Sequence, residues 1–250
     1  MQSPSVRLLR QPRVGALMSV PALAALAILW DQATPGGAGA GSAEITLLAV
    51  ILAVGVVLGA QFPIHVRAAQ KMGMDSVALF LTAVLLPPPL AAVTAGVGVL
   101  TAEMISRGRR GATYSDIATT TARWVLITLL TAELVHLQGG DEAFNLLLLA
   151  TGAGLMWIGD ILTLPLLLTP ITGETAGRVI VETVRAAGAT EGAQYLLGLL
   201  GALAVTQQIG ALALLAVPVA LVYLAFKSAK EMHDGTRQLL ESLADTVDLR

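Results

Sequence analysis

Long apolar runs restrict the fold of this chain more than any other feature. Six of them approach or reach the roughly 20 residues that a helix needs to cross a bilayer. They are Val14–Trp30, Ile45–Phe62, Ile117–Leu137, Ala143–Leu168, Ala186–Val205 and Ile209–Phe226. A soluble α-helical protein would show a polar stripe along such helices. With 55% hydrophobic and 13% charged residues, too little polar surface remains to cover a water-soluble globule. The sequence therefore predicts a helical membrane protein.

Two shorter apolar segments flank a run of prolines. Asp75–Leu86 and Leu90–Ile105 lie on either side of Pro87–Pro89, and consecutive prolines cannot continue a helix but suit a tight turn between two helices. The first segment is short for a full span, so it either begins earlier, near Ala68, or is a re-entrant element. We expect an all-α, polytopic transmembrane bundle of about eight spans, or about six if this pair does not cross.

The basic residues fall on one side of this predicted bundle. On the eight-span arrangement, all 15 Lys and Arg residues lie before the first span or around the connections after the second, fourth, sixth and eighth. The opposite connections contain none. The positive-inside rule then places both termini of this multi-pass protein in the cytoplasm. A signal peptide cleaved near Ala38–Ala40 is the alternative for the first run, but it would be about 40 residues long against the usual 15–30.

Motifs of catalysis and cofactor binding are missing from the sequence. It contains no Gly-rich phosphate loop, metal-ligand spacing or nucleophile elbow. It has no cysteine and three histidines, which speaks against thiolate and histidine-rich metal sites. We therefore assign no enzyme activity, metal or cofactor to residues 1–250, and we expect the lipid bilayer rather than a nucleic acid as the surrounding partner.

Ionisable residues inside the apolar runs need an account, and we single out five: Glu103, Arg123, Glu133, His136 and Asp160. Each costs at least a few kcal/mol at mid-membrane unless it is paired, hydrated or functional. Arg123, Asp160 and Glu103 fall in the cytoplasmic half, so we expect Arg123 to pair with one of the two carboxylates. A structural ion pair, a polar ligand pocket and a switch all remain open. Glu133 and His136 share a helix face near the outer end and are weak candidates for a metal or proton site.

Two further segments predict local packing. Gly55 and Gly59 form a GxxxG pattern, which lets another helix of the same chain, or less readily of a second copy, approach closely. Residues 172–185 mix apolar and charged side chains, which suits either a helix on the inner membrane surface or an extension of the seventh span.

The last residues change character. Residues 227–250 are charged and favour a helix, with Leu239, Leu243 and Val247 on an apolar stripe, typical of a cytoplasmic signalling helix that contacts a partner. Residues 239–250, LLESLADTVDLR, resemble the opening of an HD-GYP domain, the cyclic di-GMP phosphodiesterase module of bacteria. Residues 1–226 are similar to the multi-helix sensor regions that precede such domains, as at Phe62–Ile64.

This resemblance implies a location in the bacterial inner membrane and a function for the whole protein. Residues 1–226 would be a transmembrane sensor or anchor domain, and 227–250 a connecting helix that forms a homodimer and leads to a metal-dependent phosphodiesterase domain. None of that family's metal-binding His or His-Asp motifs lies within these residues, so no catalytic residue is carried over. The alternatives are a small transporter or substrate-capturing membrane subunit, and a passive membrane anchor.

The predicted topology is testable with reporter fusions. Fusions after Ala40 and after Gly140 should report an extracytoplasmic location, because both positions follow runs whose other ends carry the basic residues. An alkaline phosphatase and a green fluorescent protein fusion at each site would measure this. A cytoplasmic signal at either site would contradict the arrangement.

Overall fold

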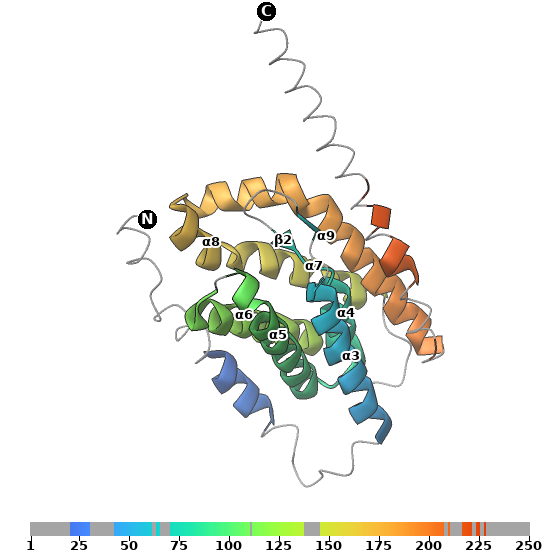
Figure 1. The fold of residues 1–250 in the computed structure, drawn as a ribbon. Helices are drawn as coiled ribbons and strands as arrows, with labels where there is room; N and C mark the ends of the chain where they lie inside the picture. Colours follow the sequence, from blue (N-terminus) through green and yellow to red (C-terminus); the bar gives the residue numbers. More distant parts are fainter. Residues whose placement is uncertain are drawn as a thin grey trace, which may run out of the picture.

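The computed structural model describes residues 21–30, 43–61, 64–65, 71–110, 112–137, 146–207, 210, 217–221, 224–225 and 228. These residues are almost entirely helical (Figure 1). The helices are α3 (Ala43–Gln61), α4 (Ser76–Leu85), α5 (Pro88–Arg110), α6 (Tyr114–His136), α7 (Leu146–Thr163), α8 (Pro165–Thr172) and α9 (Ala176–Gln207), with the helical segments Pro21–Trp30 and 217–221. The strands β1 (Ile64–His65) and β2 (Lys71–Met72) form a short antiparallel pair.

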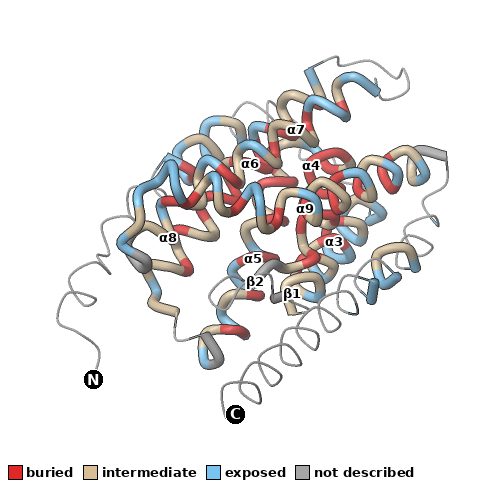
Figure 2. Tube along the Cα trace, turned by 90° about the horizontal axis from the view of Figure 1, so that it is seen from above, coloured by how far each residue is buried: buried red, intermediate tan, exposed pale blue. Residues whose placement is uncertain are grey.

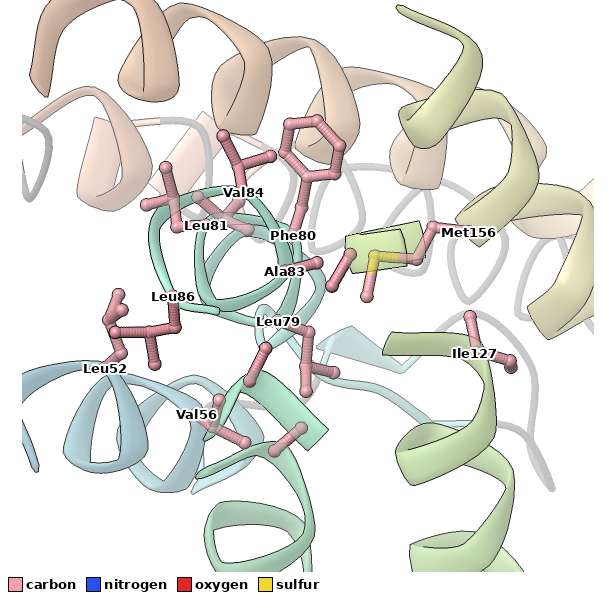
Figure 3. Close-up of a cluster of buried hydrophobic side chains, with 14 of the residues drawn as sticks. Leu52, Val56, Leu79, Phe80, Leu81, Ala83, Val84, Leu86, Ile127 and Met156 are labelled. Carbon is pink, nitrogen blue, oxygen red and sulfur yellow. The ribbon is translucent and has the colours of Figure 1, made fainter. Parts of the chain in front are cut away.

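The short helix α4 forms the centre of the packing. It contacts α3, α5, α6, α7 and α9, and eight of its ten residues are buried. Its sequence is apolar around the whole circumference, and such a helix is stable only where neighbours cover every face. Figure 3 shows Leu79 and Leu86 turned toward the α3 side chains, while Phe80 projects from another face of the helix. Figure 2 shows the buried residues gathered on α4 and on the facing sides of its neighbours.

The structure decides how the segment before the prolines is built. A helix of 10 residues is about 15 Å long, half of a bilayer core of about 30 Å. It begins at Ser76 rather than near Ala68, because the strand β2 precedes it. The backbone N–H of Met74 donates to the carbonyl of Gly59 at 3.0 Å, which ties the start of α4 to the end of α3. The sequence left open an earlier start near Ala68 and a short element. The structure has the short element.

The glycine pair of α3 faces α4. A Cβ on Gly59 would lie 2.8 Å from the backbone of Asp75, and a Cβ on Gly55 would lie 3.4 Å from the Cβ of Ala78. The prediction that this GxxxG pattern packs within the chain is therefore confirmed. The order of these contacts also shows that α4 runs antiparallel to α3.

Helix α5 returns in the direction of α3. Gly98 packs against Val56, and Gln61 Nε2 donates to Ser106 Oγ at 3.4 Å, so the two helices are parallel. The turn between α4 and α5 lies at Leu86, whose backbone is extended, and at Pro87. The expected hairpin at the prolines is thus present, and α5 starts at Pro88 because a first-turn proline lacks only an N–H that a helix does not use.

Three helices of the described chain are long and apolar enough to cross a membrane: Ala43–Gln61, Pro88–Gly108 and Leu146–Thr169. Their number supports a membrane protein, while the count of about eight spans stays a prediction. Large apolar side chains of α3 are 49–59% exposed, namely Leu47, Val50, Ile51, Val54 and Leu58. A continuous apolar face of this kind suits lipid rather than water.

Helix α9 settles one alternative left by the sequence. It runs without interruption over 32 residues from Ala176 to Gln207. Residues 176–185 are therefore an extension of the helix that contains the apolar run 186–205, and they do not form a separate surface helix.

The close contact between α3 and the start of α4 predicts that alanine destabilises the protein at Gly59 but not at a glycine with open space around it. Gly59→Ala should lower the free energy of unfolding by about 1–3 kcal/mol, because its methyl group would overlap the backbone of Met74 and Asp75, which leads into α4. Gly154→Ala, on α7, is the matched control, since a Cβ there meets nothing within 4 Å. Denaturant unfolding of both variants in detergent micelles would measure the difference. Equal stability of the two variants would contradict the close approach.

Candidate functional site: a buried charge cluster of α6, α7 and α9

Arg123 is a buried cation at the middle of α6. It is 2% exposed. Its Nη2 donates to Asp160 Oδ1 at 2.5 Å and to the Asp160 carbonyl at 3.0 Å, and its Nε donates to Thr163 Oγ1 at 2.8 Å. The guanidinium thus binds a side chain and the backbone of α7 together. Multiple hydrogen bonds of this kind hold a planar guanidinium in one orientation.

Local sequence explains why these residues meet. Helix α6 starts at a capping box, in which Thr113 Oγ1 accepts from the Asp116 N–H at 3.2 Å and Asp116 Oδ2 accepts from the Thr113 N–H at 2.8 Å. Helix α7 packs antiparallel to α6, with Gly159 against Ile127. Because a glycine at the contact brings the two backbones close, Asp160 lies opposite Arg123.

The cluster sits next to a proline at the junction of α7 and α8. Helix α7 ends at Thr163 and α8 begins at Pro165, whose ring removes one backbone donor. The Asp160 carbonyl still accepts from the Leu164 N–H at 2.9 Å as well as from Arg123. The helical hydrogen bonding therefore continues across Leu164, and α7 and α8 together form the apolar helix Leu146–Thr169.

A second carboxyl, Glu191 on α9, lies beside the pair. It is 5% exposed, and its neighbours are Asp160, Trp157 and Arg123. One guanidinium is therefore surrounded by two carboxyl groups from different helices.

Gln194 and Tyr195 continue the cluster toward the start of α4. They lie three and four residues after Glu191, on the same helix face, and both are more than 95% buried. Gln194 Nε2 donates to the carbonyl of Gly73 at 3.2 Å. The Tyr195 ring packs edge-to-face on Phe80, with 6.4 Å between centroids. This face of α9 thus joins the charges to the central helix.

Several buried polar atoms of this region have no hydrogen-bond partner among the residues that the structure describes. They include Trp157 Nε1, Glu191 Oε2, Gln194 Oε1 and Tyr195 Oη. More than 90% of buried polar groups in proteins are partnered by protein or water. Three of them have polar neighbours within the protein, because Trp157 lies beside Glu191 and Ser76 lies beside Tyr195.

The other residues singled out by the sequence lie elsewhere. Glu103 is half-buried on α5. Glu133 and His136 are half-buried near the end of α6, and the His136 ring Nδ1 is 2.8 Å from the carbonyl of Ala132 on the preceding turn. Among the described residues, no group of three His, Cys, Asp or Glu side chains is placed to hold a metal ion. Leu239, Leu243 and Val247 lie outside the described residues.

Sequence reasoning missed Glu191, Gln194 and Tyr195. The signal was present, because polar residues at i, i+3 and i+4 within the apolar run 186–205 fall on one face of a helix.

Comparison with known protein families, curated proteins and solved structures finds no significant match to this chain.

The buried pair predicts non-additive mutational effects. Arg123→Gln and Asp160→Asn should each destabilise the protein by about 2–4 kcal/mol, since each leaves a buried partner uncompensated. The double variant should lose less than the sum, with a coupling energy of about 1–2 kcal/mol. Unfolding in mixed micelles would measure the cycle.

An exposed pair on the same protein supplies the control. Arg178 and Glu182 are 68% and 30% exposed and 3.3 Å apart, so their coupling should stay below about 0.5 kcal/mol. Additive effects of Arg123→Gln and Asp160→Asn would show that the buried contact contributes no specific stabilisation.

Proposed function

We propose that residues 1–226 form a membrane-embedded signal-input module that controls a cytoplasmic HD-GYP cyclic di-GMP phosphodiesterase through residues 227–250. The observation that carries this proposal is the buried cluster of Arg123, Asp160 and Glu191. Charges inside an apolar bundle are costly, and a pair that only fixes helix register needs a single carboxylate, whereas this cluster has two from different helices. In a sensor they supply a polar element whose arrangement a stimulus can change.

The arrangement of the charges supports a switch between two states. Arg123 binds Asp160 on α7, while Glu191 on α9 lies beside the same group. A shift of α9 toward Arg123 would exchange one carboxylate partner for another without leaving the guanidinium unpaired. Packed helices with two discrete arrangements are the usual elements of signalling transitions.

We further propose a bacterial inner-membrane location with about eight spans and both termini in the cytoplasm. The one-sided basic residues support this orientation, together with a contact at the α5–α6 connection. There, the Arg107 guanidinium lies 3.7 Å from the centre of the Tyr114 ring. A cation on an aromatic ring is favourable at a membrane–water boundary, where Tyr and Arg both anchor helices.

The proposed coupling runs through the C-terminal segment. The resemblance of residues 239–250 to the start of an HD-GYP domain supports a continuous helix that pairs with a second copy. Leu239, Leu243 and Val247 repeat every four residues and so lie along one face. Pairing along this face would transmit a rotation or shift of the membrane helices to the enzyme.

One observation favours a transporter as a second candidate. Pro165, at the junction of α7 and α8, follows Asp160 by little more than one turn and removes one backbone donor, and weakened helices with polar groups are a feature of the substrate sites of many transporters. Against this stands the lack of an internal sequence repeat. A phosphodiesterase response to changes in this module would favour the sensor.

The coupling is tested with two charge insertions on opposite faces of the C-terminal segment. In the complete gene product in native membranes, Leu243→Asp should change cyclic di-GMP hydrolysis at least about threefold, because it charges the proposed dimer seam. Gln238→Asp adds the same charge on the opposite face and should leave hydrolysis unchanged. Membrane insertion should be normal for both variants.

Two results would overturn the proposed coupling. One is a reading frame that contains no HD-GYP domain after Arg250, together with the lack of any phosphodiesterase response. The other is equal hydrolysis and equal cysteine crosslinking between copies for wild type and Leu243→Asp, which would leave a plain membrane anchor.

A further inference from the structure

Two carboxyl groups from different helices meet beside one guanidinium. The Asp160 side chain of α7 is 14% exposed, and Glu191 of α9 is 5% exposed. Asp160 is both a charged neighbour and a hydrogen-bonding neighbour of Glu191. An ionised carboxylate only accepts hydrogen bonds, whereas a protonated carboxyl group also has one O–H donor. Contact between the two groups therefore requires a proton on one of them.

Arg123 is engaged with the first of these carboxyl groups. Its hydrogen bonds to α7 go to Asp160 Oδ1, to the Asp160 carbonyl and to Thr163 Oγ1. Asp160 also acts on Glu191 more strongly than Arg123 does. An ionised Glu191 would therefore meet mainly repulsion, so Asp160 is the carboxylate of the pair and Glu191 is the acid.

The remaining groups around Glu191 come from α7, from α9 itself and from the start of α4. Trp157 of α7 lies beside it. Tyr195 follows one turn later on α9, and its own neighbours are Ser76 and Asp75. Trp157 is a neutral donor that, like the Arg123 cation, favours an ionised carboxyl group, whereas Asp75 adds a negative charge on the far side of Tyr195.

A proton on Glu191 reconciles these groups with an apolar surrounding. The acid can donate to Asp160, and an O–H···O⁻ hydrogen bond is short and strong. The Arg123–Asp160 pair and a neutral Glu191 together carry no net charge. A bundle of apolar helices favours this state, since each unpaired charge in it costs several kcal/mol.

We propose that Glu191 and Asp160 form a proton-binding site, in which one proton on Glu191 joins α9 to α7. Loss of this proton to water would leave two carboxylates in contact, and their repulsion would push α9 away from Asp160. The contact between the two helices thus depends on pH. Proton binding needs no enzyme downstream, so this inference and the proposed signalling function fail separately.

Infrared spectroscopy of the purified full chain in detergent micelles detects the proton directly. At about pH 6.5, roughly two units above the ordinary value for glutamate, exposed carboxyl groups are ionised. Wild type should still show the C=O stretching band of a protonated carboxylic acid, and Glu191→Gln should lose it. Glu182→Gln, on an earlier and more exposed turn of the same helix, is the matched control and should keep the band.

A second variant keeps the infrared test decisive if Glu191→Gln does not fold. Trp157→Phe removes the N–H beside Glu191 but leaves its carboxyl group in place. The frequency of the C=O band depends on the hydrogen bonds of the acid, so this variant should shift the band without removing it.

Thermal unfolding measures the same proton through stability. If the folded protein binds one proton more than the unfolded chain, its stability falls as the pH rises. The Tm of wild type should then fall by about 3 °C per pH unit between about pH 6 and 8. Glu191→Gln should show a flatter dependence, and Glu182→Gln should match wild type.

Three outcomes would overturn the proposal. A wild-type spectrum without a carboxylic acid band at about pH 6.5 would show that both carboxyl groups are ionised. A band that is unchanged in Glu191→Gln, or in Trp157→Phe, would place the protonated group elsewhere. Equal pH dependence of the Tm in wild type and Glu191→Gln would show that this proton does not hold α9 against α7.

Discussion

Burial of the Arg123 guanidinium sets the geometry of α6 and α7. A charge that is 2% exposed must find its partners inside the protein, since removal from water costs several kcal/mol. Asp160 and Thr163 supply them only if the two helices are antiparallel and in one register. Such a pair adds little net stability compared with apolar residues of the same volume. Its effect is selective, because any other register leaves a buried charge without a partner.

The central helix and the charge cluster are linked through α9. Phe80 of α4 contacts Tyr195 and packs where Gly198 leaves room for its ring. One turn earlier, Glu191 lies beside Asp160. One face of α9 therefore contacts the apolar core at one end and the charges at the other. A displacement of α9 that changes its contact with Asp160 must also change its packing on α4.

Sparse charges made part of this site predictable from sequence. Arg123 and Asp160 are among few ionisable residues in apolar runs, and helical depth alone suggested that they could pair. The GxxxG pattern of Gly55 and Gly59 predicted a close helix–helix contact, because two glycines one turn apart remove side chains from one helix face and let another backbone approach. The i, i+3 and i+4 spacing of Glu191, Gln194 and Tyr195 indicates a common helix face, but their partners on α7 and α4 are far away in the sequence and are brought together only by the fold. The length of α4 was ambiguous, because an inner helix and a short span have the same apolar composition.

The medium explains why polar contacts matter so much in such a bundle. If lipid surrounds the exposed apolar face of α3, the hydrophobic effect no longer separates helix–helix contacts from helix–lipid contacts. Close packing must then hold the helices, as at Gly59 against the start of α4 and Gly152 against Val135. Such contacts are strong only at short range and tolerate little separation. A change in the charge cluster would therefore shift α9 as a rigid body along its packed neighbours rather than unfold it. Motion of that kind is transmitted along a continuous helix, which is the property that a signal-input module requires.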